Sequence, residues 1–347
     1  MSIPRRRFLQ SAAALSVAPA FARPAAAAGV TELAVGSIGH SIAHFPLYVG
    51  AQLGYFQQNG VDIGKVTEFS TGALVGTAVT AGSLDIGSSV ITDVFSLAKA
   101  GRSVKILSVS ANSYYIDIVG SKAFLQATKL NEKSSIADRI RALRGKNIGV
   151  TGPGSGTEAL VLYLLKLGTI DRTRDVQLVN VGANIPAVLA TLRSGRVDLV
   201  SFAWPLGQQA QVEDIGEIFI SPAHGDLPEM THEIQGVVFT TQDEIDKKRA
   251  AVSGFIRGYA KACTTILKDP ARSRDLLKGF YPNLDPKALD LTLDVYRSTS
   301  VSSNPMPSEV GFLRAIKFHQ AAGLISEPYA YNDLIATKVI ADAFGKR

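Results

Sequence analysis

The chain has little cysteine and little charge. Among its 347 residues it has one cysteine, Cys263, so an intrachain disulfide is excluded and no cysteine cluster is available for zinc. Burial as a small apolar residue accounts for Cys263. Only 19% of the residues are charged, whereas 46% are hydrophobic, which is typical of a well-packed globular protein. The length is comfortable for two domains.

Long apolar runs are also missing, which excludes a membrane-spanning helix after residue 28. Residues 1–28 place arginines before a short apolar run that ends in small residues, and this order is typical of a secretory signal. Arg5 and Arg6, followed by Arg7-Phe8-Leu9, resemble a twin-arginine export motif. We therefore expect residues 1–28 to be a cleaved signal peptide and the mature protein to be soluble and periplasmic.

The positive net charge belongs mostly to this N-terminal segment. The whole chain has 36 basic and 30 acidic residues, a formal charge of +6. Residues 1–28 hold four arginines and no acid, so 36 − 4 basic against 30 acidic residues leaves +2 on the mature chain. A nearly neutral chain gives no reason to expect nucleic acid as a partner.

Strand-like and helix-like patterns alternate along the mature chain. The order is strand, helix, strand, helix, strand from residue 31 to about 119, and a second unit with the same order follows. One expected helix spans Phe45–Gly60 and ends at its glycine. After about residue 243 the pattern is mostly helical. The alternation predicts an α/β fold.

The segment "TGPGSGTE" (151–158) lies between a predicted strand and a predicted helix. Such a glycine loop suits an anion, because it exposes backbone N–H groups at the positive end of a helix. A phosphate-binding P-loop is excluded because no Gly-Lys-Ser/Thr follows. The dinucleotide pattern lacks its acid at the end of the next strand, and the glycines that would flank a hydrolase serine are Pro153 and Thr157 here.

No motif brings a catalytic acid and base, or a set of metal ligands, together. His40 and His44 are one helical turn apart, but Ser41 stands where a zinc protease has glutamate. Asp85 and Asp198 begin strands in matching contexts, and turn bonding accounts for both. We therefore expect no catalytic residue, no metal and no cofactor.

The loops at the carboxyl ends of the predicted strands are rich in serine, threonine, glycine and aromatic residues and contain few charges. Ligands of open α/β sheets bind at these ends. The composition suits hydroxyls, helix N-termini and aromatic walls around a ligand, although plain helix capping also explains each loop by itself. The only tryptophan, Trp204, is either a core residue or a pocket wall.

Four segments in order resemble substrate-binding proteins of ABC transporters, in the branch for nitrate, sulfonates, taurine and thiamine-pyrimidine precursors. They are "HFPLYVGAQLGYFQQNGVDI", "LVGTAVTAGSLDIG", "LRGKNIGVTGPGSGTEALV" and "AVLATLRSGRVDLVSFAWP". The resemblance covers about residues 31–240. It implies the type II periplasmic binding fold, with lobe 1 at 31–119 plus 236–347, lobe 2 at 120–235, and crossings near 118–122 and 231–236. The ligand would lie in a cleft between the lobes.

The resemblance also implies ligand-binding positions and partners. The positions are His40, Ser41, Ser70, Thr71, Gly72, Ser88, Ser89, Ser113, Tyr114, Ser155, Gly156, Thr157 and Trp204. The loops 154–157 and 70–72 must then face the same cleft. The implied partners are a small-molecule ligand, an ABC permease and its ATPase. We expect a monomer that meets the membrane only through the permease.

The ligand class follows from a departure from the family pattern. Several family members have an acid directly after the tryptophan, but here Trp204 is followed by Pro205. A ligand amino group would lack that partner, so we expect a small organic anion, sulfonate- or carboxylate-like, with its apolar part against Tyr114 and Trp204. No arginine clamp is evident, which keeps a neutral heterocycle such as a pyrimidine precursor open.

Two other functions remain open on the same scaffold. An enzyme like a thiamine-pyrimidine synthase would need a reactive lysine or histidine, for which Lys65 and His44 are available. A solute sensor that presents its closed form to a receptor has no distinguishing sequence feature. We expect a binding protein and not an enzyme.

Overall fold

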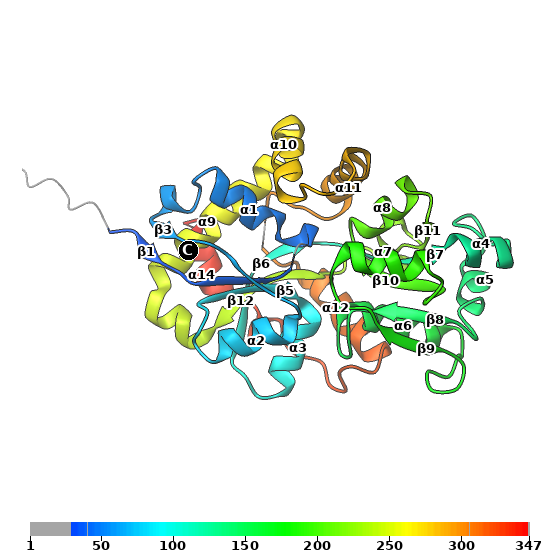
Figure 1. The fold of residues 1–347 in the computed structure, drawn as a ribbon. Helices are drawn as coiled ribbons and strands as arrows, with labels where there is room; N and C mark the ends of the chain where they lie inside the picture. The colour runs from blue at the N-terminus through cyan, green and yellow to red at the C-terminus, as the bar shows by residue number, and fades with distance from the viewer. Residues whose placement is uncertain (1–28, 40, 305, 346–347) are drawn as a thin grey trace, which may run out of the picture.

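The computed structural model describes residues 29–39, 41–304 and 306–345, which form two α/β units side by side (Figure 1). The predicted signal peptide, residues 1–28, and the predicted site residue His40 lie outside the described residues. Each unit is built on a five-stranded sheet, and a small two-stranded sheet joins β1 (Thr31–Glu32) to β3 (Val61–Asp62). The alternation of strands and helices predicted from the sequence is confirmed.

The first sheet has the order β4-β2-β5-β12-β6. Its strands are β2 (Val35–Ile38), β4 (Thr67–Phe69), β5 (Ile86–Val90), β6 (Val104–Ala111) and β12 (Gly236–Thr241). Strand β2 is parallel to β4 and β5, whereas β12 is antiparallel to β5 and β6. One strand of this sheet thus comes from far along the chain, and it lies between two strands from the N-terminal part.

The second sheet has the order β11-β7-β10-β8-β9. Its strands are β7 (Ile116–Ser121), β8 (Asn147–Val150), β9 (Gln177–Asn180), β10 (Leu199–Ala203) and β11 (Gly216–Ile220). Strand β8 is parallel to β9 and β10, whereas β7 is antiparallel to β10 and β11. Both sheets therefore combine parallel strands with antiparallel ones.

Asp85 and Asp198 have the same structural role in the two sheets. Asp85 Oδ2 accepts a hydrogen bond from the backbone N–H of Ala34 at 2.7 Å, and Asp198 Oδ2 accepts from the N–H of Asn147 at 2.9 Å. Each bond spans 51 residues and ties the start of one strand to the start of its parallel neighbour. The two acids are thus structural, through bonds between strands and not through the turn bonding that the sequence predicts.

Helices connect the strands and cover the sheets. They are α1 (Phe45–Gln52), α2 (Gly72–Thr80), α3 (Ile91–Lys99), α4 (Lys122–Thr128), α5 (Ile136–Arg141), α6 (Gly156–Leu167), α7 (Ile185–Arg193), α8 (Leu206–Val212), α9 (Gln242–Lys268), α10 (Pro270–Phe280), α11 (Pro286–Thr299), α12 (Glu309–Ala321), α13 (Tyr331–Leu334) and α14 (Thr337–Ala343). Figure 1 shows α1 above the first sheet and α2 and α3 below it. Several begin at a side-chain cap, including Thr71 for α2 and Ser155 for α6.

The predicted helix Phe45–Gly60 is wrong in its extent. Helix α1 ends at Gln52, and Gly54 turns the chain with a φ of +65°. A single 3₁₀ turn, Gln57–Asn59, follows, and Gly60 ends it in the left-handed conformation. The apolar spacing continues past Gln52 because Phe56 returns to the core through this turn, not through a longer helix.

The chain passes between the sheets twice, at 112–115 and at 221–235. The predicted lobe boundary at 119/120 and the predicted crossing at 118–122 fall within or across strand β7, so the first change of sheet comes earlier than expected. The C-terminal helices contact both units: α11 packs on α8, and α12 packs on α6. One apolar cluster is centred on each sheet, and a third includes residues of both.

Candidate ligand-binding cleft

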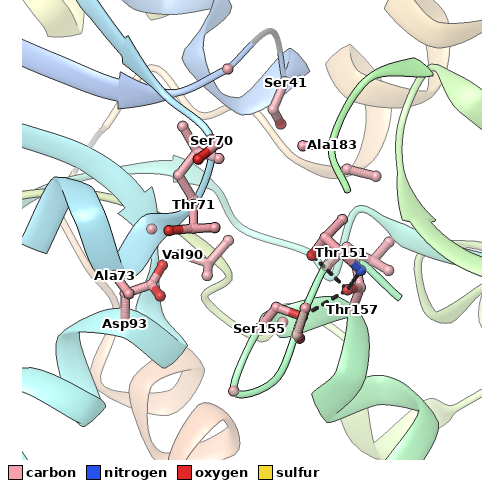
Figure 2. Close-up of a pocket in the computed structure, with 18 of the residues that line it drawn as sticks. Ser41, Ser70, Thr71, Ala73, Val90, Asp93, Thr151, Ser155, Thr157 and Ala183 are labelled. Carbon is pink, nitrogen blue, oxygen red and sulfur yellow. Dashed lines mark hydrogen bonds between the residues drawn. The ribbon is translucent and has the colours of Figure 1, made fainter. Parts of the chain in front are cut away.

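A cavity of about 420 Å³ opens between the two sheets. Figure 2 shows loops from both units facing each other across it. One side, here the first rim, consists of Ser41, Ser70–Gly72 and Asp93. The opposite side, here the second rim, consists of the loop Thr151–Thr157. Tyr115 lies in the first crossing and completes the lining together with residues at the end of β10.

Eight of the predicted site residues line this cavity: Ser41, Ser70, Thr71, Gly72, Ser155, Gly156, Thr157 and Trp204. The two glycine loops, 70–72 and 154–157, therefore face the same cavity, as the sequence requires. They come from different sheets, so neither unit forms the cavity alone.

Four other predicted residues do not line the cavity, and they are used inside the fold. Ser88 Oγ lies 2.7 Å from Nδ1 of His44, and Ser89 Oγ donates to Asp93 Oδ2. Ser113 bonds to Ser300 through their hydroxyls. The fourth is Tyr114. Each of the four is at most 5% exposed, so a position near a strand end does not by itself bring a side chain into the cleft.

The predicted aromatic wall at Tyr114 is wrong by one residue. The hydroxyl of Tyr114 donates to the carbonyl of Gly156 at 2.6 Å, and its ring packs edge-on against Phe318 with the centroids 5.0 Å apart. The neighbouring residue Tyr115 lines the cavity instead. Consecutive side chains of an extended segment point to opposite sides, so a shift of one residue exchanges core and cleft.

The second rim is held together by its own hydroxyls. Thr157 Oγ1 accepts from the N–H of Thr151 at 2.9 Å and lies 2.8 Å from the hydroxyls of both Thr151 and Ser155. Ser155 Oγ also donates to the carbonyl of Gly152 at 2.7 Å. Gly154 supplies the left-handed turn of this loop, with φ +73°. The loop is thus preorganised, and what it offers a ligand is mainly backbone N–H groups of the first turn of α6.

The first rim is more open. Ser70 and Thr71 are exposed, and Thr71 caps α2 through the N–H of Leu74 at 3.4 Å. Gly72 lies directly on the Ser89–Asp93 pair, because a Cβ at this position would overlap Asp93 Oδ2 and Ser89 Oγ. Asp93 is 8% exposed, and burial raises the pKa of its carboxyl to about 6. An acidic group therefore lies at the edge of the cleft.

Trp204 is both a core residue and a wall of the cleft. Its side chain is 1% exposed, belongs to the apolar cluster shared by the two units, and lines the cavity. The indole Nε1 donates to Asp117 Oδ2 at 2.7 Å. Burial raises the pKa of Asp117 to about 6. Trp204 packs edge-on to Tyr115 at 6.4 Å, and Phe202 adds to the same wall.

The predicted ligand positions omit Asp93, Tyr115, Phe202 and Thr151, which also line the cavity. His44 lines it too, although the sequence suggested it only as a metal ligand or a reactive group. A signal for Asp93 is its spacing of four residues from Ser89 across the start of a helix. Lys65, considered for enzyme chemistry, does not line the cavity, and His44 is bonded to Ser88. Cys263 is buried in α9, and burial raises its pKa to about 12, in keeping with the predicted apolar role.

Within residues 29–39, 41–304 and 306–345, no group of three or more His, Cys, Asp or Glu side chains is placed to hold a metal ion. In the same part of the chain, no helix combines the length and the apolar character needed to cross a bilayer.

Known proteins are similar to this chain in sequence or in structure. The curated protein "Putative binding protein YtlA" of Bacillus subtilis (strain 168) is 22% identical over 326 residues, which are 89% of each chain. The ligand-binding component of an ABC-type import system from Staphylococcus aureus, solved with zinc bound, has a TM-score of 0.70 and 15% identity, and the match covers 90% of this chain and 99% of that one.

Two further solved structures are of proteins named for the anions that they bind, an alkanesulfonate and nitrate. The alkanesulfonate-binding protein SsuA from Xanthomonas axonopodis pv. citri, bound to MOPS, has a TM-score of 0.67 and 18% identity, with 90% and 99% coverage. The periplasmic nitrate-binding protein NrtA from Synechocystis PCC 6803 has a TM-score of 0.69 and 11% identity, with 91% and 89% coverage. These likenesses confirm the expected periplasmic binding protein fold. A model of the NMT1-like family matches residues 26–278, so the chain belongs to the NMT1-like family.

Proposed function

We propose that this protein is the exported solute-binding component of an ABC importer. It captures a small organic molecule between its two units and delivers it to a permease driven by an ATPase. The observation that carries this proposal is the cavity lined by loops of both sheets, whose volume of about 420 Å³ suits a small molecule. The Staphylococcus aureus neighbour, which is named as the ligand-binding component of an ABC-type import system, supports it.

The binding motion is a closure of two lobes around the solute. We place the lobe boundary between Ala111 and Ile116, not at 119/120, so that β7 stays whole, and the return crossing at 221–235. Closure requires contacts with the ligand that exist only in the closed form.

Two classes of solute fit the proposal. The organic anion expected from the sequence would use backbone N–H groups at helix N-termini. A neutral heterocycle is favoured by the lining, because the described residues of the cavity include no lysine and no arginine. Tyr115, Phe202 and Trp204 provide an apolar wall for either class.

A thermal-shift screen of residues 29–347 tests the proposal. The panel contains sulfonates, carboxylates, nitrate, nucleobases, amines and metal salts. A true solute raises the melting temperature by mass action and is recovered unchanged. A panel without any stabilising compound, or a compound that is chemically converted, would contradict the proposed binding function and favour the enzyme alternative.

Export through residues 1–28 has its own test. If the segment is a twin-arginine signal, the double variant Arg5→Lys, Arg6→Lys should stay inside the cell as the full-length protein. Cell fractionation with an antibody to the mature chain measures it. Normal appearance of the double variant in the periplasm would mean that another export route is used. Gel filtration of the mature chain tests the expected monomer.

A further inference from the structure

Asp93 is an acidic residue in a cleft for which the sequence predicts an anionic ligand. It lies in the first turn of α3, lines the cavity, and is only 8% exposed. Its carboxyl accepts hydrogen bonds from Ser89 Oγ and from the backbone of Val90. A carboxylate has about four acceptor positions, so this one can accept further hydrogen bonds from a ligand.

Asp93 has no lysine or arginine partner among the described residues that line the cavity. Among the lining residues that the structure describes, it is the only carboxylate, and they contain neither lysine nor arginine. A buried charge without a partner is costly, and a ligand that supplies a positive or hydrogen-bond-donating group removes part of that cost. The carboxyl therefore favours a ligand with N–H donors.

The N-termini of α2, α3 and α6, which border the cleft, each lie near a carboxylate of the protein. Asp93 lies in the first turn of α3 and directly beneath Gly72, the first residue of α2. At α6, Glu158 accepts from the N–H of Gly154 and pairs with Arg172 at 2.6 Å. A sulfonate at the start of α2 or α3 would approach Asp93, and like charges at short distance disfavour each other, whereas the charge of Glu158 at α6 is balanced by Arg172.

We infer that Asp93 determines the ligand specificity of the cleft and that the ligand presents an amine or amidine N–H group to its carboxyl. The apolar part of that ligand lies against Tyr115, Phe202 and Trp204. This inference rests on the proposed binding function and specifies the ligand class. Several family members have an acid after the tryptophan that could pair with a ligand amino group, and this chain lacks it. Asp93, on α3, would take that role here.

A series of compounds with one phenyl body and different head groups tests the inference. The probes are 2-phenylethylamine and benzamidine as cations, 2-phenylethanesulfonate and phenylacetate as anions, and 2-phenylethanol as the neutral member. Calorimetry at pH 7.5 on residues 29–347 gives the affinities. We expect the cations to bind at least about 10-fold more tightly than the anions, as expected for a charge-assisted hydrogen bond.

The variant Asp93→Asn removes the negative charge of this side chain and keeps its shape nearly unchanged. It should weaken both cations by about 10-fold or more and change 2-phenylethanol by less than about twofold. Asp246→Asn is the matched control, because Asp246 is exposed on α9, outside the cavity, and accepts a hydrogen bond from Gln242. Circular dichroism checks the fold of each variant, and the ranking of head groups on the unmodified chain needs no variant.

The inference is overturned if the cations fail to bind the unmodified chain or bind Asp93→Asn equally well. Sulfonates that bind, and bind more tightly to Asp93→Asn, would overturn it while leaving the proposed binding function intact. The binding function itself falls only if the wider thermal-shift panel also yields no solute.

Discussion

The two rims of the cleft have similar sequences and different structures. Each is a loop of glycine and hydroxyl residues that follows a strand and opens a helix. In the second rim the hydroxyls of Thr151, Ser155 and Thr157 are engaged with one another and with the backbone. In the first rim Ser70 and Thr71 are exposed, and Asp93 lies below them. A hydroxyl in a strand-end loop therefore does not by itself indicate a ligand contact.

From this difference we expect different roles for the two rims of the cleft. The second rim is a preformed wall whose polar side chains stabilise the loop. The first rim has polar groups available for recognition. Substitutions in the second rim should mainly change stability, whereas those in the first rim should mainly change affinity, and the following variants test this division.

Gly72→Ala should have the largest effect. Its Cβ would overlap the Ser89–Asp93 pair, so α2 or Asp93 must shift. Overpacking of this kind costs roughly 1–3 kcal/mol, and we expect affinity to fall by more than about 100-fold because the first rim is displaced. Urea denaturation and calorimetry measure the two effects. Gly82→Ala, at the end of α2 with φ +76° and open space around it, is the control for backbone strain alone. Equal affinities for both variants would contradict the assignment.

Thr157→Val should mainly destabilise the protein. It removes a hydroxyl that three groups of the second rim approach within 2.9 Å. A buried donor left without a partner costs about 1–3 kcal/mol, so the free energy of unfolding should fall by about that amount. Urea denaturation measures it, with Thr173→Val on an exposed turn as the control. A loss below about 0.5 kcal/mol would show that the hydroxyl network does not hold the loop.

The contributions of Asp93 and Asp117 to stability should rise when the pH is lowered from 7.5 to 5, whereas buried His319, whose pKa is lowered to about 4, contributes in the opposite direction. The pKa values of Asp93 and Asp117 are raised to about 6 by burial, above the unfolded value near 3.9. The folded state then binds these protons more tightly, so their ionisation costs stability as the pH rises through 6. Each group should contribute on the order of 1 kcal/mol over this interval.

The titration is assigned by comparing the unmodified chain with Asp93→Asn and Asp117→Asn. Asp93 faces Ser89 and Tyr115, and Asp117 faces Trp204, Ser221, His224 and Asp226. Each variant should lose part of the pH dependence, while exposed carboxyls contribute equally to all three proteins. Identical pH profiles of urea denaturation would mean that neither carboxyl titrates as expected.

Ser70→Ala should have the smallest effect on stability. Its side chain is exposed and makes no hydrogen bond with any other described residue, so the free energy of unfolding should stay within about 0.5 kcal/mol. Its affinity should nevertheless fall a few-fold if the hydroxyl contacts the solute. Calorimetry with the best solute from the thermal-shift panel measures this. An unchanged affinity would mean that the hydroxyl of Ser70 does not contact the solute.

The sequence predicts the order of strands and helices because apolar spacing and caps such as Thr71 and Ser155 are local signals. It also identifies both glycine loops. It does not distinguish Tyr114 from Tyr115, since the direction of a side chain in the crossing depends on packing against Phe318. It does not place Asp93 in the cleft, because that depends on the approach of Gly72 from another helix. The early end of α1 depends on Gly54 in the same way, through long-range packing of Phe56.

The central claim is that a solute binds between the two rims, and one titration tests it most directly. Trp204 is the only tryptophan and lines the cleft, so its fluorescence reports on this place in the molecule. Calorimetry and fluorescence are recorded on residues 29–347 with the same solute. We predict one saturable site and a change in Trp204 emission with the same dissociation constant. Binding measured by calorimetry without any change in the tryptophan signal would contradict a site in this cleft.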